Sequence, residues 1–213
     1  MGLVSCLAKS ARTSAKRFGG SLGFFQLISV RIRDNGPGRL ASLEESKVLE
    51  HNLAIASDLR RFSLASGLIE MIRILVPERQ PDSRLFAALK EGLRRASEEA
   101  WTGMLPLSLD LAILDALGLA PRLDECAGCG KAPADDVPVR FDPSRGVVCR
   151  RCGAHGHALS AQARKVLVRS CGNVMCGSDA DHPSSEAALS EARDILDHFI
   201  RYHTGRPLKS RSL

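Results

Sequence analysis

The chain has 213 residues, 44% of them hydrophobic, which is enough to bury the core of one large domain or two smaller ones. Aromatic residues make up only 4%, which favours a core of aliphatic side chains packed between helices over a large β-sandwich. The net charge of +6 favours a polyanionic partner. No apolar run reaches the roughly 18 residues of a membrane span and no signal-peptide core is present, so we expect a cytoplasmic protein without a membrane contact.

The first 33 residues contain six Lys or Arg and no acidic residue. Two strands are predicted here, in "GLVSCLAKS" at 2–10 and "GFFQLISVRIR" at 23–33, because apolar residues alternate along the second stretch. A basic loop lies between them, and "DNGPG" at 34–38 predicts a turn before a short strand near Leu40. An acid-free, Ser- and Arg-rich segment is also typical of an organelle transit peptide, but a removable peptide does not need the alternation of a strand.

From Leu43 the apolar residues recur at intervals of three and four, which predicts helices as far as Pro77. The same spacing returns further along the chain. The sequence therefore predicts an α+β protein that is mostly helical, with a β-domain at 1–42 and a helical domain at 43–213. The predicted helical stretches are 43–77, 83–93, 107–117, one opening at 160, and one from about 185 to 200.

The strongest chemical signal is a pair of Cys-x-x-Cys motifs, "CAGC" and "CRRC", in an insert at about 122–157. Two such turns can place four thiolates around one tetrahedral Zn²⁺ if the residues between them form a hairpin. Zinc binding at such sites is worth about 10 to 16 kcal/mol, so we expect the insert to fold only with its structural metal. The predicted ligands are Cys126, Cys129, Cys149 and Cys152.

Other interpretations of these cysteines are weaker. A redox Cys-x-x-Cys needs a single motif at a strand-to-helix turn, and disulfides are disfavoured by the odd total of seven cysteines. His155 and His157 are near enough to compete as ligands, but four cysteines already complete the shell, and catalytic zinc needs an open position. We expect Arg150 and Arg151 to favour thiolates at the second motif.

Three stretches, in this order, resemble the RecO family of bacterial recombination mediators: "GLVSCLAKSARTSAKRFGGSLGFFQLISVRIR", the paired cysteines after "LDALGLAPRLDEC", and "FIRYHTGRPLKSRSL". The resemblance implies an N-terminal OB-fold barrel, a helical domain and a four-cysteine zinc insert. Family members normally carry further residues, which form the first barrel strands, ahead of the glycine that is Gly2 here. We therefore expect residues 1–42 to form an incomplete OB-fold.

The resemblance also implies a function. Members of the family bind single- and double-stranded DNA, anneal complementary strands covered by single-strand-binding protein, and act with RecR in loading the recombinase RecA. Because the family binds DNA, we expect a nucleoid-associated protein. No covalent chemistry is involved, so we expect that the protein is not an enzyme. Basic side chains on the loop would follow the DNA phosphates, with two arginines of the following strand as weaker candidates. The expected DNA-binding residues are Lys9, Arg12, Lys16, Arg17, Arg31 and Arg33.

Two other functions stay open at this point. A zinc-ribbon adaptor in transcription or complex assembly would contact protein or RNA through its basic ends and would not anneal DNA. A metal-dependent nuclease or other hydrolase is weaker, because the sequence has no paired carboxylates, His-rich motif or Gly-rich phosphate loop. A further interpretation of the loop cations is a solvated surface without a partner.

Overall fold

The computed structural model describes residues 1–11, 13–36, 38–153, 156–172 and 185–211. The chain divides into two compact units, of which the first is Met1–Glu99 and the second begins at Ala100. Each unit has its own buried core of mainly aliphatic side chains, to which Phe18 and Phe25 contribute in the first unit and Phe141 and Phe199 in the second. In the part of the chain that the structure describes, no helix combines the length and the apolar character needed to cross a membrane.

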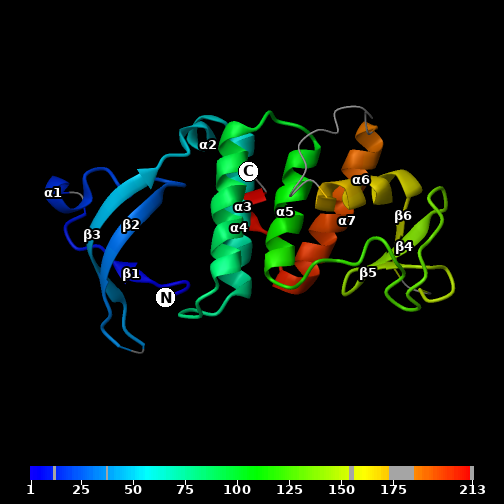
Figure 1. Ribbon diagram of the computed structural model, residues 1–213, viewed down its shortest axis with the longest axis horizontal. Coiled ribbons are helices and arrows are strands. Elements are labelled where there is room, and N and C mark those ends of the chain that lie inside the picture. The colour runs from blue at the N-terminus through cyan, green and yellow to red at the C-terminus, as the bar shows by residue number, and fades with distance from the viewer. Residues whose placement is uncertain (12, 37, 154–155, 173–184, 212–213) are drawn as a thin grey trace. The chain divides into compact units, whose positions relative to one another are not determined.

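The first unit contains a sheet of three strands in the order β1-β3-β2 (Figure 1). Strand β1 runs parallel to the central strand β3, and β2 runs antiparallel to it. Ala41 and Leu43 of β3 are buried and contribute to the core of this unit. The elements of the first unit are β1 Cys6–Leu7, α1 Ala15–Phe18, β2 Leu27–Arg33, β3 Ala41–Glu50, α2 Leu53–Ser57, α3 Leu59–Leu75 and α4 Ser83–Glu98.

The helix predicted to begin at Leu43 is wrong over residues 43–50, which belong to β3. The pairing with β2 explains the error. Ile28 pairs with Val48 and Leu27 pairs with Glu50, so Leu49 is the extra residue of a β-bulge. The bulge interrupts the strict alternation of a strand and lets the apolar residues around it match a helical spacing. The boundary expected after residue 42 falls inside this strand, and the extent of independently folding domains stays a prediction.

Strand β2 lies in the stretch where alternation predicts a strand, but its apolar residues are not buried. None of the residues Leu27–Arg33 is buried, and Val30 is 43% exposed. The sheet is open, with β1 and β2 at its edges, so the described residues do not form a closed barrel. The incomplete OB-fold therefore stays a prediction that an open three-stranded sheet neither contradicts nor establishes.

Aspartates cap the N-termini of the two long helices of the first unit. The side chain of Asp58 accepts a hydrogen bond from the backbone N–H of Arg60 at 2.8 Å, which caps α3. Asp82 caps α4 by accepting from the N–H of Leu85 at 2.9 Å. The predicted start of a helix at Ser83 is confirmed.

The second unit is built around α5, most of whose residues are buried. Helices α6 and α7 pack against α5, and α7 also contacts β6 of a small sheet with the order β5-β4-β6. Helix α5 begins three residues before the predicted stretch, and the helices predicted from 160 and 185 are confirmed as α6 and α7. The elements are α5 Met104–Ala116, β4 Val139–Asp142, β5 Gly146–Val148, β6 His157–Leu159, α6 Ala161–Gly172, α7 Glu186–Thr204 and the 3₁₀ turn η1 Lys209–Arg211.

Candidate metal centre and basic surfaces

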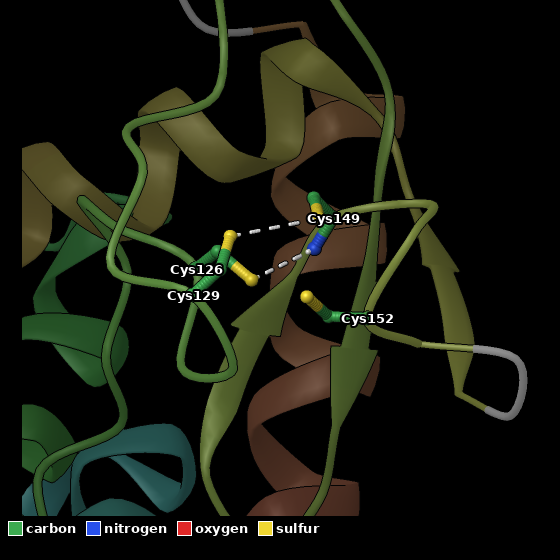
Figure 2. A group of neighbouring side chains, drawn as sticks. All are labelled: Cys126, Cys129, Cys149 and Cys152. Atoms are coloured by element: carbon green, nitrogen blue, oxygen red, sulfur yellow. Dashed lines mark hydrogen bonds between the residues drawn. The ribbon is translucent and has the colours of Figure 1, made fainter.

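The four predicted ligand cysteines form one cluster, in which all the sulfur atoms lie within 4.8 Å of one another. Figure 2 shows the four side chains directed toward a common centre, with Sγ of Cys129 and Sγ of Cys149 4.0 Å apart. A tetrahedral zinc ion with Zn–S bonds of about 2.3 Å needs sulfur atoms about 3.8 Å apart. The cluster therefore fits a metal held by four thiolates.

Backbone hydrogen bonds shape the two turns that carry these cysteines. In the first turn the N–H of Gly130 donates to the carbonyl of Cys126 at 2.8 Å. In the second the N–H groups of Cys152 and Gly153 both donate to the carbonyl of Cys149 at 3.0 Å. Strands β4 and β5 pair as an antiparallel hairpin between the turns, as the spacing of the motifs predicts.

The electrostatics of the cluster differ from one cysteine to another before metal binds. Burial raises the pKa of Cys126, but the backbone N–H groups of Cys149, Gly128 and Cys129 lower it by a larger amount. The net result is a pKa of about 6. Hydrogen bonding to the sulfurs of Cys149 and Cys129, with burial, raises the pKa of Cys152 to about 12. Metal binding near neutral pH must therefore release protons from this cluster.

The two arginines of the second motif were expected to favour thiolates, but backbone groups lower the pKa of Cys149 instead. The pKa of Cys149 is lowered by the backbone N–H groups of Cys152 and Arg151. The turn itself directs these amides at the sulfur, so the guanidinium groups of Arg150 and Arg151 are not needed to form the thiolate.

The insert is attached to the helices of its unit by a buried arginine. Arg164 of α6 is 5% exposed, and its guanidinium donates to the carbonyl of Ala134 at 2.8 Å and to that of Pro133 at 3.3 Å. The ring of His157 lies 4.1 Å from that of His198 on α7, and His157 is not among the four residues whose ligand atoms cluster. His155, the other competing histidine, lies outside the described residues.

The basic loop of the first unit is closed by one of its own cations. The guanidinium of Arg17 donates to the carbonyl of Lys9 at 2.8 Å and to Oγ of Ser14 at 3.2 Å. It also lies over the ring of Phe18, 5.1 Å from the ring centroid. Arg17 therefore holds the loop, while Lys9 is exposed.

The structure gives less support to the other predicted DNA contacts, and one of them lies outside the described residues. Lys16 belongs to the short helix α1, and Arg12 lies outside the described residues. On the sheet, Arg31 pairs with Glu45 and Arg33 pairs with Glu44 across the strands, with 3.3 Å between the charged atoms in each pair. Each of these two arginines has a carboxylate beside it, which weakens it as a phosphate contact. Among the candidates whose side chains are described, Lys9 and Arg17 belong to the loop, and Arg31 and Arg33 belong to strand β2.

One residue of the basic C-terminal stretch has a structural role that the charge count does not reveal. The guanidinium of Arg211 pairs with Asp110 of α5 and, at 2.5 Å, with Asp197 of α7. Asp110 is buried in a largely apolar helix, and burial raises its pKa to about 6 in spite of the arginine. The sequence gives one indication of a buried ion pair, because Asp110 is the one acidic residue in the apolar stretch "LPLSLDLAIL".

A helical core with an insert folded around four cysteines places the second unit among helical proteins with a metal-binding knuckle. The chain belongs to the RecO family: the family model described as "Recombination protein O C terminal" matches residues 56–212. The "DNA repair protein RecO" of Anaeromyxobacter sp. (strain K) is 35% identical over 99% of this chain and 84% of its own length.

Relatives from other bacteria give the same result. The "DNA repair protein RecO" of Myxococcus xanthus is 33% identical over 98% of this chain and 84% of its own length. That of Geobacter sulfurreducens is 31% identical over the same shares. The family predicted from the three sequence stretches is confirmed.

Proposed function

We propose that the chain is a DNA-binding recombination mediator in DNA repair. It anneals complementary strands and helps to load the recombinase onto single-stranded DNA that is covered by single-strand-binding protein. The observation that carries this proposal is the similarity, over nearly the whole chain, to relatives that are named DNA repair protein RecO. The proposed partners are single- and double-stranded DNA, RecR and single-strand-binding protein.

The metal in this proposal is a structural Zn²⁺. Four cysteines supply a complete tetrahedral set, so no coordination position is left for a substrate or a catalytic water. The ion would hold the two turns and the β4–β5 hairpin together, and the insert would not take part in covalent chemistry.

The loop around Lys9 is the proposed phosphate contact on the first unit. The exposure of Lys9 and the closure of the loop by Arg17 support this assignment, because a contact that is already ordered loses less conformational freedom on binding. Arg31 and Arg33 stay in the proposal as weaker contacts, since each must leave or share a glutamate.

The proposal is tested by annealing complementary oligonucleotides that have been coated with single-strand-binding protein. A variant with Lys9, Arg12 and Lys16 all changed to Ala keeps Arg17 and therefore keeps the loop closed. Because each phosphate contact to single-stranded DNA contributes about −0.7 to the log–log salt slope, this variant should flatten the slope by about 2. The matched control is Lys165→Gln with Arg169→Gln, on exposed positions of α6.

The outcomes separate the loop assignment from the function. An unchanged salt slope in the triple variant would remove the loop from the interface while leaving annealing by the protein intact. A wild-type chain that binds zinc but neither binds nor anneals DNA would contradict the mediator function and favour a zinc-ribbon adaptor.

A further inference from the structure

An exposed aromatic ring lies near the C-terminal end of α7. Tyr202, the one tyrosine of the chain, is 57% exposed. Its ring meets that of His203 edge-on, with 5.3 Å between centroids, and the His203 ring lies 4.4 Å from that of Phe199. Phe199 in turn contacts Phe141 of β4, at 5.9 Å, and both phenylalanines are 1% exposed. A continuous series of rings therefore connects Tyr202 to the buried core and restricts its movement.

Two uncompensated cations lie within four residues of this tyrosine in the sequence. Arg201 and Arg206 are exposed, and neither has a hydrogen-bond or ion-pair partner for its side chain within the described ranges. The nearest preceding acid, Asp197, is occupied by Arg211 at 2.5 Å. From Arg201 to the end of the sequence there is no acidic residue. The positive charge beside Tyr202 is therefore available to an external anion.

The backbone that carries Arg206 is fixed on both sides. Gly205 ends α7 in the left-handed conformation with φ of 70°, and Oγ of Thr204 donates to the carbonyl of Arg206 at 2.6 Å. Leu208 is 4% exposed and holds the chain against the unit. Arg206 therefore emerges from an ordered turn four residues after Tyr202.

A purely structural explanation accounts for only part of this surface. A cation in the last turn of a helix interacts favourably with the helix dipole, which explains Arg201. It does not explain Arg206, which lies beyond the helix, nor a tyrosine that leaves more than half of its surface in water.

We propose that Arg201, Tyr202 and Arg206 form a second binding site for single-stranded DNA, on the second unit. A base stacks on the ring of Tyr202, and the two guanidinium groups contact the flanking phosphates. The ligand is single-stranded, because the base faces of a duplex are covered by their neighbours. The site rests on the proposed DNA-binding function and adds to it a contact far along the chain from the basic loop, as a protein that handles two strands requires.

The test uses the full, zinc-loaded chain and a single-stranded oligothymidylate that carries 5-iododeoxyuridine. Irradiation should crosslink the oligonucleotide to the peptide that contains Tyr202, identified by mass spectrometry. Tyr202→Ala should lose the crosslink and bind about tenfold more weakly, whereas Tyr202→Phe keeps the ring and should retain both. Changing Arg201 and Arg206 to Gln should flatten the salt slope by about 1.4, and the α6 control Lys165→Gln with Arg169→Gln should not.

The outcomes distinguish this site from the function it rests on. A wild-type chain that does not bind the oligothymidylate contradicts the proposed binding of single-stranded DNA, on which this site rests. A wild-type chain that binds, but crosslinks only through other peptides and keeps its affinity in Tyr202→Ala, overturns the second site alone. An equal loss of affinity for duplex DNA in Tyr202→Ala would also overturn it, because stacking requires an uncovered base.

Discussion

Asp110 is a carboxylate buried in the central helix of the second unit. The guanidinium of Arg211 supplies the opposite charge that stabilises its ionised form there. Burial disfavours the ionised form and raises the pKa of Asp110 to about 6, while Arg211 acts in the opposite direction. The folded state therefore holds this proton more tightly than the unfolded chain does. For this group alone, stability falls as pH rises from its usual pKa through about 6.

Arg211→Ala should destabilise the second unit by about 3 to 5 kcal/mol at pH 8, because it leaves Asp110 charged and buried without its partner. The loss should be smaller at pH 6, since the carboxyl can then bind a proton. Urea unfolding at both pH values in excess zinc, with the wild type alongside, measures this difference. Asp110→Leu combined with Arg211→Met should recover most of the stability, and a cost that is equal at both pH values would contradict the buried-charge explanation.

Among the elements, strand β5 of the metal-binding insert depends on one close backbone approach. Gly146 has φ of +109°, and a Cβ built on it would lie 2.3 Å from the carbonyl oxygen of Arg122. The same carbonyl accepts a hydrogen bond from the N–H of Val147 at 2.7 Å. A larger residue would push apart the segment that leads into the first cysteine turn and the strand that leads into the second.

Gly146→Ala should therefore destabilise the insert by about 3 kcal/mol and weaken zinc binding. Gly118→Ala is the matched control, because Gly118 also has positive φ, of +72°, but a Cβ there would have no atom within 4 Å. The control should cost only about 1 kcal/mol and leave zinc binding unchanged. Chelator competition and urea unfolding measure both effects, and equal losses in the two variants would show that the close approach is unimportant.

The elements also show which features the sequence could predict. The cysteine site was predictable because each ligand pair lies within one four-residue turn, so the geometry is local. Helices α5, α6 and α7 follow from apolar spacing for the same reason. Strand β3 could not be predicted, because the bulge at Leu49 breaks the alternation on which a strand prediction depends. The partner of Arg211 lies 101 residues away, and only the folded unit brings it to Asp110.

The whole molecule has two compact units, and the cysteine cluster belongs to the second alone. The first unit holds its sheet and its long helices α3 and α4 with mainly aliphatic side chains and has no part in metal coordination within the described residues. Metal affects the two units differently for this reason.

Removing the metal with excess chelator should expose residues 122–157 to protease and leave an N-terminal fragment that contains the whole first unit, Met1–Glu99, intact. The physical reason is that the insert loses the binding free energy that supports its folding, about 10 to 16 kcal/mol at comparable sites. Limited proteolysis with mass spectrometry measures this, and Cys126→Ser with Cys149→Ser should give the same pattern without chelator. Equal cleavage in both units would contradict the assignment of the metal to one of them.

Tyr202 and Trp101, the one tryptophan of the chain, both lie beyond Ala100. The second unit therefore contains both of the natural fluorophores, and the first unit is silent in tyrosine and tryptophan emission. Fluorescence during unfolding registers the metal-binding unit alone, whereas far-ultraviolet circular dichroism registers the helices of both. The difference between the two signals isolates the unit that carries the basic loop, without a label and without cutting the chain.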